Sequence, residues 1–361
     1  MMRMINFQRV VWVFIILPLS IAACGSKSGS TKATKPNIIF LLTDDQRFDA
    51  LGCMGNSEIK TPRIDELASK GLVFTNYYNT TAICMASRAT IMTGMYEFKT
   101  GCNFQHGPLT QDKFESSYPV LLREAGYRTG FAGKFGFGVV PGDTKSNSNW
   151  HSHDRMPMDK FDWWRGWPGQ GKYETADNEF MEEYAEEYPH VTRALGTAAA
   201  DFIRESGDQD KPFCLSVSFK APHSPVRPDP EYDHVYEGKT FTKPCNYGVD
   251  AAVHLPDQSK SDRQFKKLGK RWVPKNYDEA MAQYYQLIYG VDVAVGMILD
   301  ELKELGLDDN TIIIFTTDNG YFCGSHGFGG KVLPYEEGSR APLIIFDPRS
   351  ESAGKGKTCN A

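Results

Sequence analysis

The chain has 361 residues, of which 41% are hydrophobic and 24% are charged, and its formal net charge is −5. A chain of this length can bury a substantial core, in one large domain or in two smaller ones. The small negative charge and the lack of a dominant basic stripe argue against nucleic-acid binding. We therefore expect a globular protein that does not bind nucleic acid.

The first 24 residues have the pattern of an export signal. Two arginines precede the apolar stretch 10–17, which is too short to span a bilayer. The closing sequence Ile-Ala-Ala-Cys resembles a bacterial lipoprotein box, in which Cys24 carries the lipid. We predict a signal peptide over residues 1–24 and a flexible linker over 25–35. The protein would then be an exported bacterial lipoprotein, periplasmic or anchored to the outer membrane through Cys24.

Short hydrophobic runs alternate with helical patterns along the rest of the chain. The runs that predict buried strands are 37–42, 127–132, 213–219 and 311–317. The patterns that predict helices are 61–71, 119–125 and 276–306, the last with a capping box at Asn276 and Glu279. This alternation indicates an α/β fold with a mostly parallel central sheet and helices on both faces.

Polar residues follow three of the predicted strands. Asp44 and Asp45 follow the first, His223 follows the third in a Pro-His-Ser-Pro sequence, and Asp318 and Asn319 follow the last. Each group alone is compatible with ordinary turn chemistry. In open α/β sheets, however, ligands bind beyond the carboxyl ends of the strands, so these residues should converge. A pair of carboxylates at about 4 Å costs roughly 4 kcal/mol at an effective dielectric near 20, and a hard cation, calcium rather than zinc, would offset this repulsion.

Residues 84–94, Cys-Met-Ala-Ser-Arg-Ala-Thr-Ile-Met-Thr-Gly, are the most informative run in the chain. If the run is helical, Cys84 and Arg88 share one face at its N-terminal end. Free N–H groups and the positive end of the helix dipole suit a bound oxyanion there. For this pattern alone, a buried structural cysteine is the alternative.

The spacing C-x-A-x-R followed by T-G resembles the signature of the type I, formylglycine-dependent sulfatases of the alkaline-phosphatase-like superfamily. Further segments are similar to motifs of this family in the same order: 36–45, 61–68, 126–134, 221–223, 317–320 and 331–342. The resemblance covers nearly everything from residue 36 to about 347. It implies a sulfatase catalytic domain over residues 36–361.

The resemblance also implies cofactors and residue roles. Cys84 would be oxidised to formylglycine by a formylglycine-generating or anaerobic sulfatase-maturing enzyme. One calcium ion would be held by Asp44, Asp45, modified Cys84, Asp318 and Asn319. Arg88 would steady the formylglycine, and Lys134 and Lys331 would hold the sulfate oxygens. His223 would help to protonate the leaving alcohol.

The implied chemistry accounts for these residue types. A thiol is a soft ligand that suits calcium poorly, whereas the hydrate of formylglycine offers hydroxyl groups. One hydroxyl attacks sulfur and the alcohol leaves; the second then loses its proton, the aldehyde re-forms and sulfate is expelled. The metal ion and the two lysines offset the charge on the transferring group.

Two features depart from the family pattern. The family continues its lysine as G-K-W-H-x-G, but residues 133–138 are Gly-Lys-Phe-Gly-Phe-Gly, so Gly136 stands where a histidine is expected. We hypothesise that His151 or His153 replaces it as a base. The family also has a C-terminal subdomain, and we expect it to be missing here, because only a polar tail follows residues 343–346.

Signals for the substrate are less specific. Tryptophans that could stack on sugar rings, or anchor a long loop, are Trp150, Trp163, Trp164 and Trp167. Basic residues that could contact a sulfated glycan, or form a solvated face, are Arg263, Lys266, Lys267, Lys270, Arg271 and Lys275. We predict a sulfuric ester hydrolase acting on a sulfated carbohydrate. The alternatives are a phosphodiester or phosphonate hydrolase on the same fold, and a truncated inactive homologue that binds sulfated glycans.

Overall fold

The computed structural model describes residues 35–142, 151–351 and 355–360. The predicted signal peptide, the lipid-bearing Cys24, nearly all of the linker and Trp150 lie outside the described residues. Within the described ranges, no helix combines the length and the hydrophobicity that crossing a bilayer requires.

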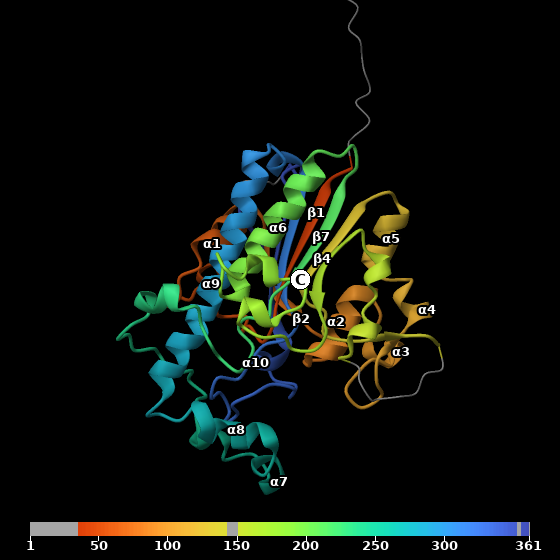
Figure 1. The fold of residues 1–361 in the computed structure, drawn as a ribbon. Coiled ribbons are helices and arrows are strands. Elements are labelled where there is room, and N and C mark those ends of the chain that lie inside the picture. The colour runs from red at the N-terminus through yellow and green to blue at the C-terminus, as the bar shows by residue number, and fades with distance from the viewer. Residues whose placement is uncertain (1–34, 143–150, 352–354, 361) are drawn as a thin grey trace, which may run out of the picture. The chain divides into compact units, whose positions relative to one another are not determined.

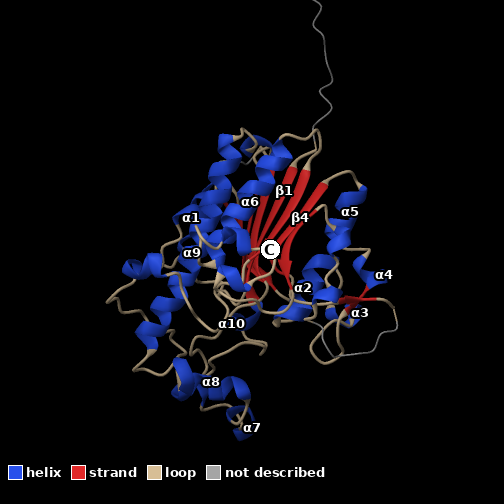
Figure 2. Ribbon diagram, in the orientation of Figure 1, coloured by secondary structure: helices blue, strands red, loops and turns tan. Residues whose placement is uncertain are grey.

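A central sheet of eight strands organises the domain (Figure 2). Its strands are β1 (Asn37–Thr43), β2 (Leu72–Tyr78), β4 (Arg128–Lys134), β6 (Trp163–Trp167), β7 (Phe213–Ser218), β8 (Thr311–Thr317), β9 (Arg340–Phe346) and β10 (Lys357–Cys359). Their order is β10-β2-β9-β8-β1-β7-β4-β6, and β9 alone among these eight runs antiparallel to its neighbours. A separate two-stranded sheet pairs β3 (Leu109–Thr110) with β5 (Val139–Val140).

Helices cover both faces of the sheet (Figure 1). The α-helices of the described residues are α1 (Pro62–Lys70), α2 (Cys84–Thr93), α3 (Glu97–Thr100), α4 (Gln111–Phe114), α5 (Tyr118–Glu124), α6 (Val191–Gly207), α7 (Asp257–Lys260), α8 (Arg263–Arg271), α9 (Tyr277–Glu304) and α10 (Glu336–Ser339). Alternation along β4 separates the two cores: Ala132 joins the core under α1, α6 and α9, whereas Phe131 joins the core under α2 and α5. The predicted α/β fold with a mostly parallel sheet is therefore confirmed.

The register of the central strands brings their carboxyl ends together. Thr43 at the end of β1 pairs with Thr317 at the end of β8, and Leu42 pairs with Ser218 at the end of β7. Beyond the ladder, Asp318 N donates to Thr43 O at 3.1 Å. The loops that follow these three strands therefore start side by side.

One sequence expectation differs from the structure, and one pair of alternatives is decided by it. The Asn276 side chain makes no capping hydrogen bond to α9, so the predicted capping box is wrong. The tryptophans form an edge strand, because β6 pairs with β4 and buries Trp163, Trp164 and Trp167. None of the three residues is more than 9% exposed to solvent, so their rings are hydrophobic anchors of β6 and do not offer a face on which a sugar could stack.

Asp292 of α9 provides a test of the fold through pH. Its buried carboxylate accepts hydrogen bonds from Arg63 N at 3.0 Å and Ile64 N at 2.8 Å, in the first turn of α1. Burial, the largest cause, raises the pKa of Asp292 from 3.8 to about 7. The folded protein therefore holds this proton more tightly than the unfolded chain, and the stability contributed by Asp292 declines as the pH rises from about 4 to about 7.

We expect Asp292→Asn to remove this part of the pH dependence, because the amide keeps an acceptor oxygen and does not titrate in this range. Thermal unfolding of both proteins across the interval would show a smaller decline of Tm for the variant. Parallel Tm profiles would contradict the assignment.

Candidate active site

All of the sequence-predicted site residues converge at the carboxyl edge of the sheet. Asp44 and Asp45 follow β1, Asp318 and Asn319 follow β8, and His223 lies in the loop after β7. The other members are Cys84, the first residue of α2, Arg88 in its second turn, Lys134, the last residue of β4, and Lys331 in the loop after β8. We call this set the Cys84 cluster.

Cys84 sits at the start of a helix, as the sequence predicts. Ile83 is extended and occupies the N-cap position of α2 without a side-chain capping hydrogen bond, and Cys84 is 3% exposed. The ammonium of Lys331 lies 3.2 Å from Cys84 Sγ. The sulfur therefore occupies the position where free helix N–H groups and a cation favour negative charge.

Arg88 ties the cluster together from the same helix. Its Nε donates to Asp318 Oδ2 at 2.7 Å, and its Nη1 donates to Lys134 O at 2.8 Å and to the Ser218 hydroxyl. Its Nη2 lies 3.4 Å from Asp44 Oδ2. These contacts fix the guanidinium in a buried place, so that α2 is joined to β1, β4, β7 and β8.

The two lysines contact different oxygens of the buried carboxylates. Lys331 Nζ pairs with Asp45 Oδ1, and it lies 3.4 Å from Asn319 Oδ1 and 3.8 Å from Asp44 Oδ1. Lys134 Nζ pairs with Asp44 Oδ2. Together with Arg88, three cations therefore balance the three carboxylates, and the repulsion that suggested a metal ion is largely offset within the protein itself.

This balance shows in the pKa values of the acids. Burial raises the pKa of Asp44, but attraction to Lys134, Arg88 and Lys331 together holds it well below its usual value. Burial is the largest cause that raises the pKa of Asp45, and it is also the largest cause that raises the pKa of Asp318 to about 6. The negative charge of Asp44 contributes to both shifts. Asp44 is therefore the most strongly ionised of the three.

His223 faces the cluster across from Lys331. Its Nε2 lies 3.7 Å from Asp45 Oδ2, and its Nδ1 makes a hydrogen bond with Ser224 O. Burial first, and then repulsion from Lys331 and other lysines, hold the pKa of His223 well below its usual value, although Asp44 opposes this shift. The imidazole is therefore neutral until a negative group arrives beside it.

The donor set fits a hard cation. Ligand oxygens of Asp44, Asp45 and Asp318 all lie within 4.8 Å of one another, and Asp44 Oδ1 is buried without a hydrogen-bond partner. The Lys331 ammonium already sits among oxygens from Asp44, Asp45 and Asn319, which shows that this space accommodates positive charge. Among the described residues, Asp44, the Cys84 thiol and His223 form a second group of this kind, whose sulfur and nitrogen are softer donors than the carboxylates.

Sequence reasoning missed two residues beside Lys134. The side chain of Gln170, in the segment after β6, accepts a hydrogen bond from Lys134 Nζ at 2.7 Å, and its backbone carbonyl accepts one from Lys220 Nζ at 3.2 Å. Lys220 is buried, and burial lowers its pKa to about 8. Lys220 directly precedes Ala-Pro-His in the sequence, so its position near the site could have been predicted. Nothing in the sequence links Gln170 to Lys134.

The backbone explains why residue 136 is glycine. Gly136 has a φ of +88°, and a Cβ at this position would lie 2.5 Å from Arg88 Cδ. A histidine would need both a strained backbone and a displaced Arg88. His153 pairs with Glu179 and lies against Phe180. The hypothesis that His151 or His153 acts as the base stays a prediction.

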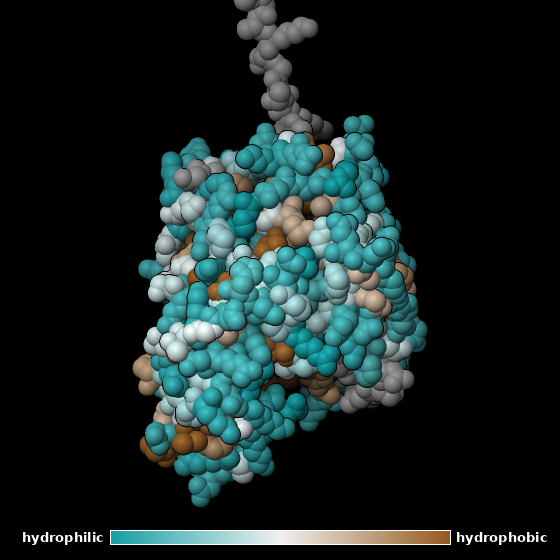
Figure 3. All heavy atoms as spheres, turned by 60° about the vertical axis from the view of Figure 1, so that its left-hand side comes forward, coloured by the Kyte–Doolittle hydropathy of each residue, from teal (hydrophilic) through white to brown (hydrophobic). Residues whose placement is uncertain are grey.

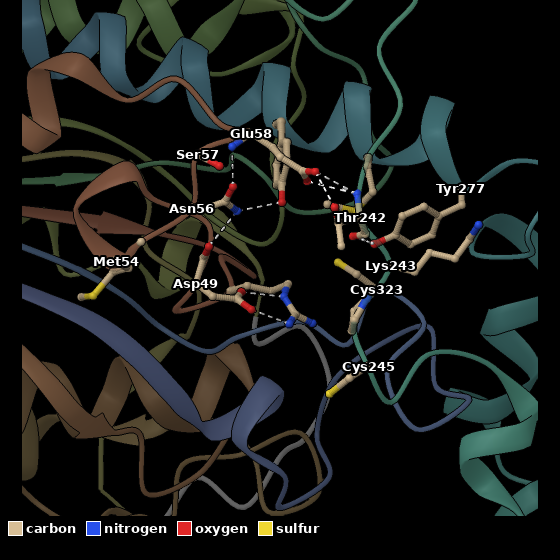
Figure 4. A pocket seen from close by; sticks show the side chains of 15 residues that line it. Asp49, Met54, Asn56, Ser57, Glu58, Thr242, Lys243, Cys245, Tyr277 and Cys323 are labelled. Carbon is tan, nitrogen blue, oxygen red and sulfur yellow. Dashed lines mark hydrogen bonds and ion pairs between the residues drawn. The ribbon is translucent and has the colours of Figure 1, made fainter.

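A separate polar cavity of about 450 Å³ lies between the loop after β1 and the segment before α9 (Figure 4). Its lining includes Arg47, whose guanidinium binds Asp49 through two contacts of 2.7 Å, and Glu58, which accepts hydrogen bonds from Thr242. None of the Cys84 cluster lines this cavity. Arg47 and Asp49 neutralise each other and Glu58 is engaged by Thr242, whereas the Cys84 cluster brings together a nucleophile, cations and carboxylates, so we place the chemistry at the Cys84 cluster.

Comparison with known proteins agrees with this geometry. The sequence matches the Sulfatase family over residues 36–359. The chain therefore belongs to the sulfatase family, a family of sulfuric ester hydrolases within the alkaline-phosphatase-like superfamily. The family that the sequence motifs indicated is thus confirmed.

Its relatives include enzymes that act on sulfate esters. It is 29% identical to an N-acetylglucosamine-6-O-sulfatase of Bacteroides thetaiotaomicron, over 94% of this chain and 68% of that protein. It is also 29% identical to an arylsulfatase of Clostridium perfringens, over 89% of this chain and 70% of that protein.

Solved structures share the fold. One, in complex with its substrate D-glucosamine-2-N,6-O-disulfate, has a TM-score of 0.69 and 26% identity, over 91% of this chain and 74% of that chain. The phosphonate monoester hydrolase of Agrobacterium radiobacter has a TM-score of 0.72 and 24% identity, over 90% of this chain and 70% of that chain. The second likeness concerns the fold alone.

Proposed function

We propose that this chain releases sulfate from a sulfated carbohydrate, using a formylglycine made from Cys84 and one bound calcium ion. The observation that carries the proposal is the position of Cys84, at the start of α2 and 3.2 Å from the Lys331 ammonium. The relatives named for glucosamine sulfates support the choice of a carbohydrate. Formylglycine supplies a hydrated aldehyde whose hydroxyl groups serve as nucleophile and as the means of expelling sulfate.

The chain's own cations would bind the sulfate group. Lys134 contacts Oδ2 of Asp44 and Lys331 contacts Oδ1 of Asp45, so their ammonium groups would hold different sulfate oxygens once the ester enters. Arg88, locked by Asp318 and Ser218, would hold residue 84 in one orientation rather than move with the substrate. Gln170 would keep Lys134 in place through a neutral contact that leaves its charge available.

His223 would supply the proton for the leaving alcohol. Its imidazole is neutral in the free protein, but an anionic ester beside it favours protonation. Asp44, Asp45, Asp318 and Asn319 would hold the calcium ion, which would supply further positive charge opposite the transferring sulfate. Lys331, whose ammonium lies among these oxygens in the structure, would be available to the ester if they held the cation.

The test is mass spectrometry of the Cys84 peptide combined with an assay of released sulfate. We expect an aldehyde at residue 84 in protein produced with a maturing enzyme, and release of sulfate from a sulfated sugar. Phosphonate hydrolysis without sulfate release would favour the phosphonate hydrolase instead. An unmodified thiol and binding without turnover would favour an inactive glycan-binding homologue.

We also propose export and lipid anchoring through Cys24, in the periplasm or at the outer membrane. The support is the sequence pattern of residues 1–24. Labelling of cells with a radioactive fatty acid would test it: label should be found in the wild type and be absent from Cys24→Ala.

A further inference from the structure

Helix α8 is fixed against the loop that carries Lys331. Its Gln264 accepts a hydrogen bond from Gly329 N at 3.0 Å and, through Oε1, from Lys331 N at 3.2 Å. Trp272, just after the helix, donates to Gly329 O at 3.1 Å. A Cβ on Gly329 would lie 2.5 Å from the backbone carbon of Lys267, so the close approach requires glycine.

Lys267 brings a positive charge from α8 to the edge of the Cys84 cluster. Its Cδ would lie only 3.0 Å from a Cβ on Gly330, so its stem passes over the residue next to Lys331. Burial, then repulsion from Arg263 and Lys331, lower the pKa of Lys267, whereas attraction to Asp45 opposes this shift. The ammonium of Lys267 is therefore within electrostatic reach of the predicted sulfate site.

Three further cations, Arg263, Lys266 and Lys270, are exposed on α8. No ion pair between described residues includes any of them or Lys267, and the carboxylate of Asp262 is engaged by Gln264 N at 2.6 Å. α8 lies at the lower end of the molecule in Figure 1, and in Figure 3 this end shows hydrophilic residues next to a hydrophobic patch. Like charges gathered without acidic partners create a positive potential that attracts anions.

We propose that α8 is a cationic subsite for a second anionic group of the substrate, so that the preferred substrate is a polyanionic carbohydrate. The inference rests on the proposed function. Lys267 binds a sulfate or carboxylate close to the sulfate that is cleaved, and Arg263, Lys266 and Lys270 extend the positive surface along the chain of sugars.

The position of α8 selects this occupant. The Lys267 stem lies against Gly330, the residue next to Lys331, so an anion that Lys267 binds lies beside a molecule held in the Cys84 cluster. A nucleic acid or a membrane surface would need a broad basic face, but the chain carries a net charge of −5. A second anion on the same carbohydrate lies close to the Cys84 cluster and needs no broad basic face.

The experiment compares three disaccharides: one with a single sulfate, one with a second sulfate, and one with a carboxylate in place of that second sulfate. kcat/KM for sulfate release is measured with the wild type, Lys267→Met, Lys267→Arg and the double variant Lys266→Met/Lys270→Met. We expect the wild type to have a higher kcat/KM for the doubly anionic substrates than for the singly sulfated one. In Lys267→Met this ratio should fall roughly tenfold, the size of effect typical of a hydrogen bond to a charged group. Lys267→Arg should retain most of it, and the double variant should show a smaller loss that added salt abolishes.

Lys211→Met is the matched control, because this exposed lysine lies just before β7, at the end of the sheet away from the site. Its preference should equal that of the wild type. Calorimetric binding of the three disaccharides to the same proteins gives an answer that does not depend on turnover. Absence of turnover with all three would overturn the proposed function alone, whereas equal preference in the wild type and Lys267→Met, by both kinetics and calorimetry, would overturn this inference.

Discussion

Replacement of Cys84 by alanine should abolish sulfate release while leaving the fold intact. The alanine side chain cannot be converted to formylglycine, so the nucleophile is lost, and losses of this kind reach at least about 10⁴-fold in kcat. Folding should persist because the sulfur makes one hydrogen bond to the rest of the described chain, from the Lys331 ammonium, and alanine suits the first turn of α2. The measurement is sulfate release under saturating substrate, alongside thermal unfolding of both proteins.

A sharper comparison uses Cys214→Ala as the matched control. Cys214 is also buried, but it lies in β7 within the sheet, and its thiol has a pKa raised by burial to about 12. We expect this variant to lose stability and retain turnover, the reverse of Cys84→Ala. Full sulfate release by Cys84→Ala would show that the nucleophile lies elsewhere.

Local patterns predicted the elements that place the site. The apolar runs of β1, β7 and β8 are unambiguous, since strands buried on both faces consist of continuous hydrophobic residues. Once these strands are parallel, the polar residues at their carboxyl ends must meet. The convergence of Asp44, Asp318 and His223 therefore follows from short-range sequence and sheet topology.

What the sequence left open depends on contacts between distant segments. Gln170 reaches Lys134 because β6 pairs with β4 at the edge of the sheet. The sequence does not predict this pairing, since the polar, glycine-containing segment around β6 is typical of a loop. The sequence likewise shows the carboxylates that would repel one another, but it does not show that Lys134, Lys331 and Arg88 contact them and offset their charge. Gly136 looked like a lost histidine, whereas its positive φ and the nearby Arg88 show a backbone position built for glycine.

Asp318→Asn should lower calcium affinity and sulfate release together. The change removes one negative ligand but keeps the shape of the side chain and an acceptor oxygen for Asp45 N, now 3.3 Å from Asp318 Oδ1. Arg88 loses its 2.7 Å carboxylate partner, yet Asp44 remains 3.4 Å away, so the guanidinium stays paired. We expect calcium affinity to fall by at least about 100-fold, since even outer-shell changes cost 10–100-fold in metal affinity.

Calorimetry with calcium after treatment with a chelator measures this effect directly. Asp292→Asn is the control, because it removes a buried carboxylate that caps α1 and lies outside the Cys84 cluster. That variant should bind calcium as the wild type does. If Asp318→Asn binds calcium equally well but is inactive, the carboxylate serves only to orient Arg88, and the ion is held without it. If the wild type binds no calcium, the three cations of the cluster already satisfy its carboxylates, and the lysines and Arg88 must offset the charge of the sulfate alone.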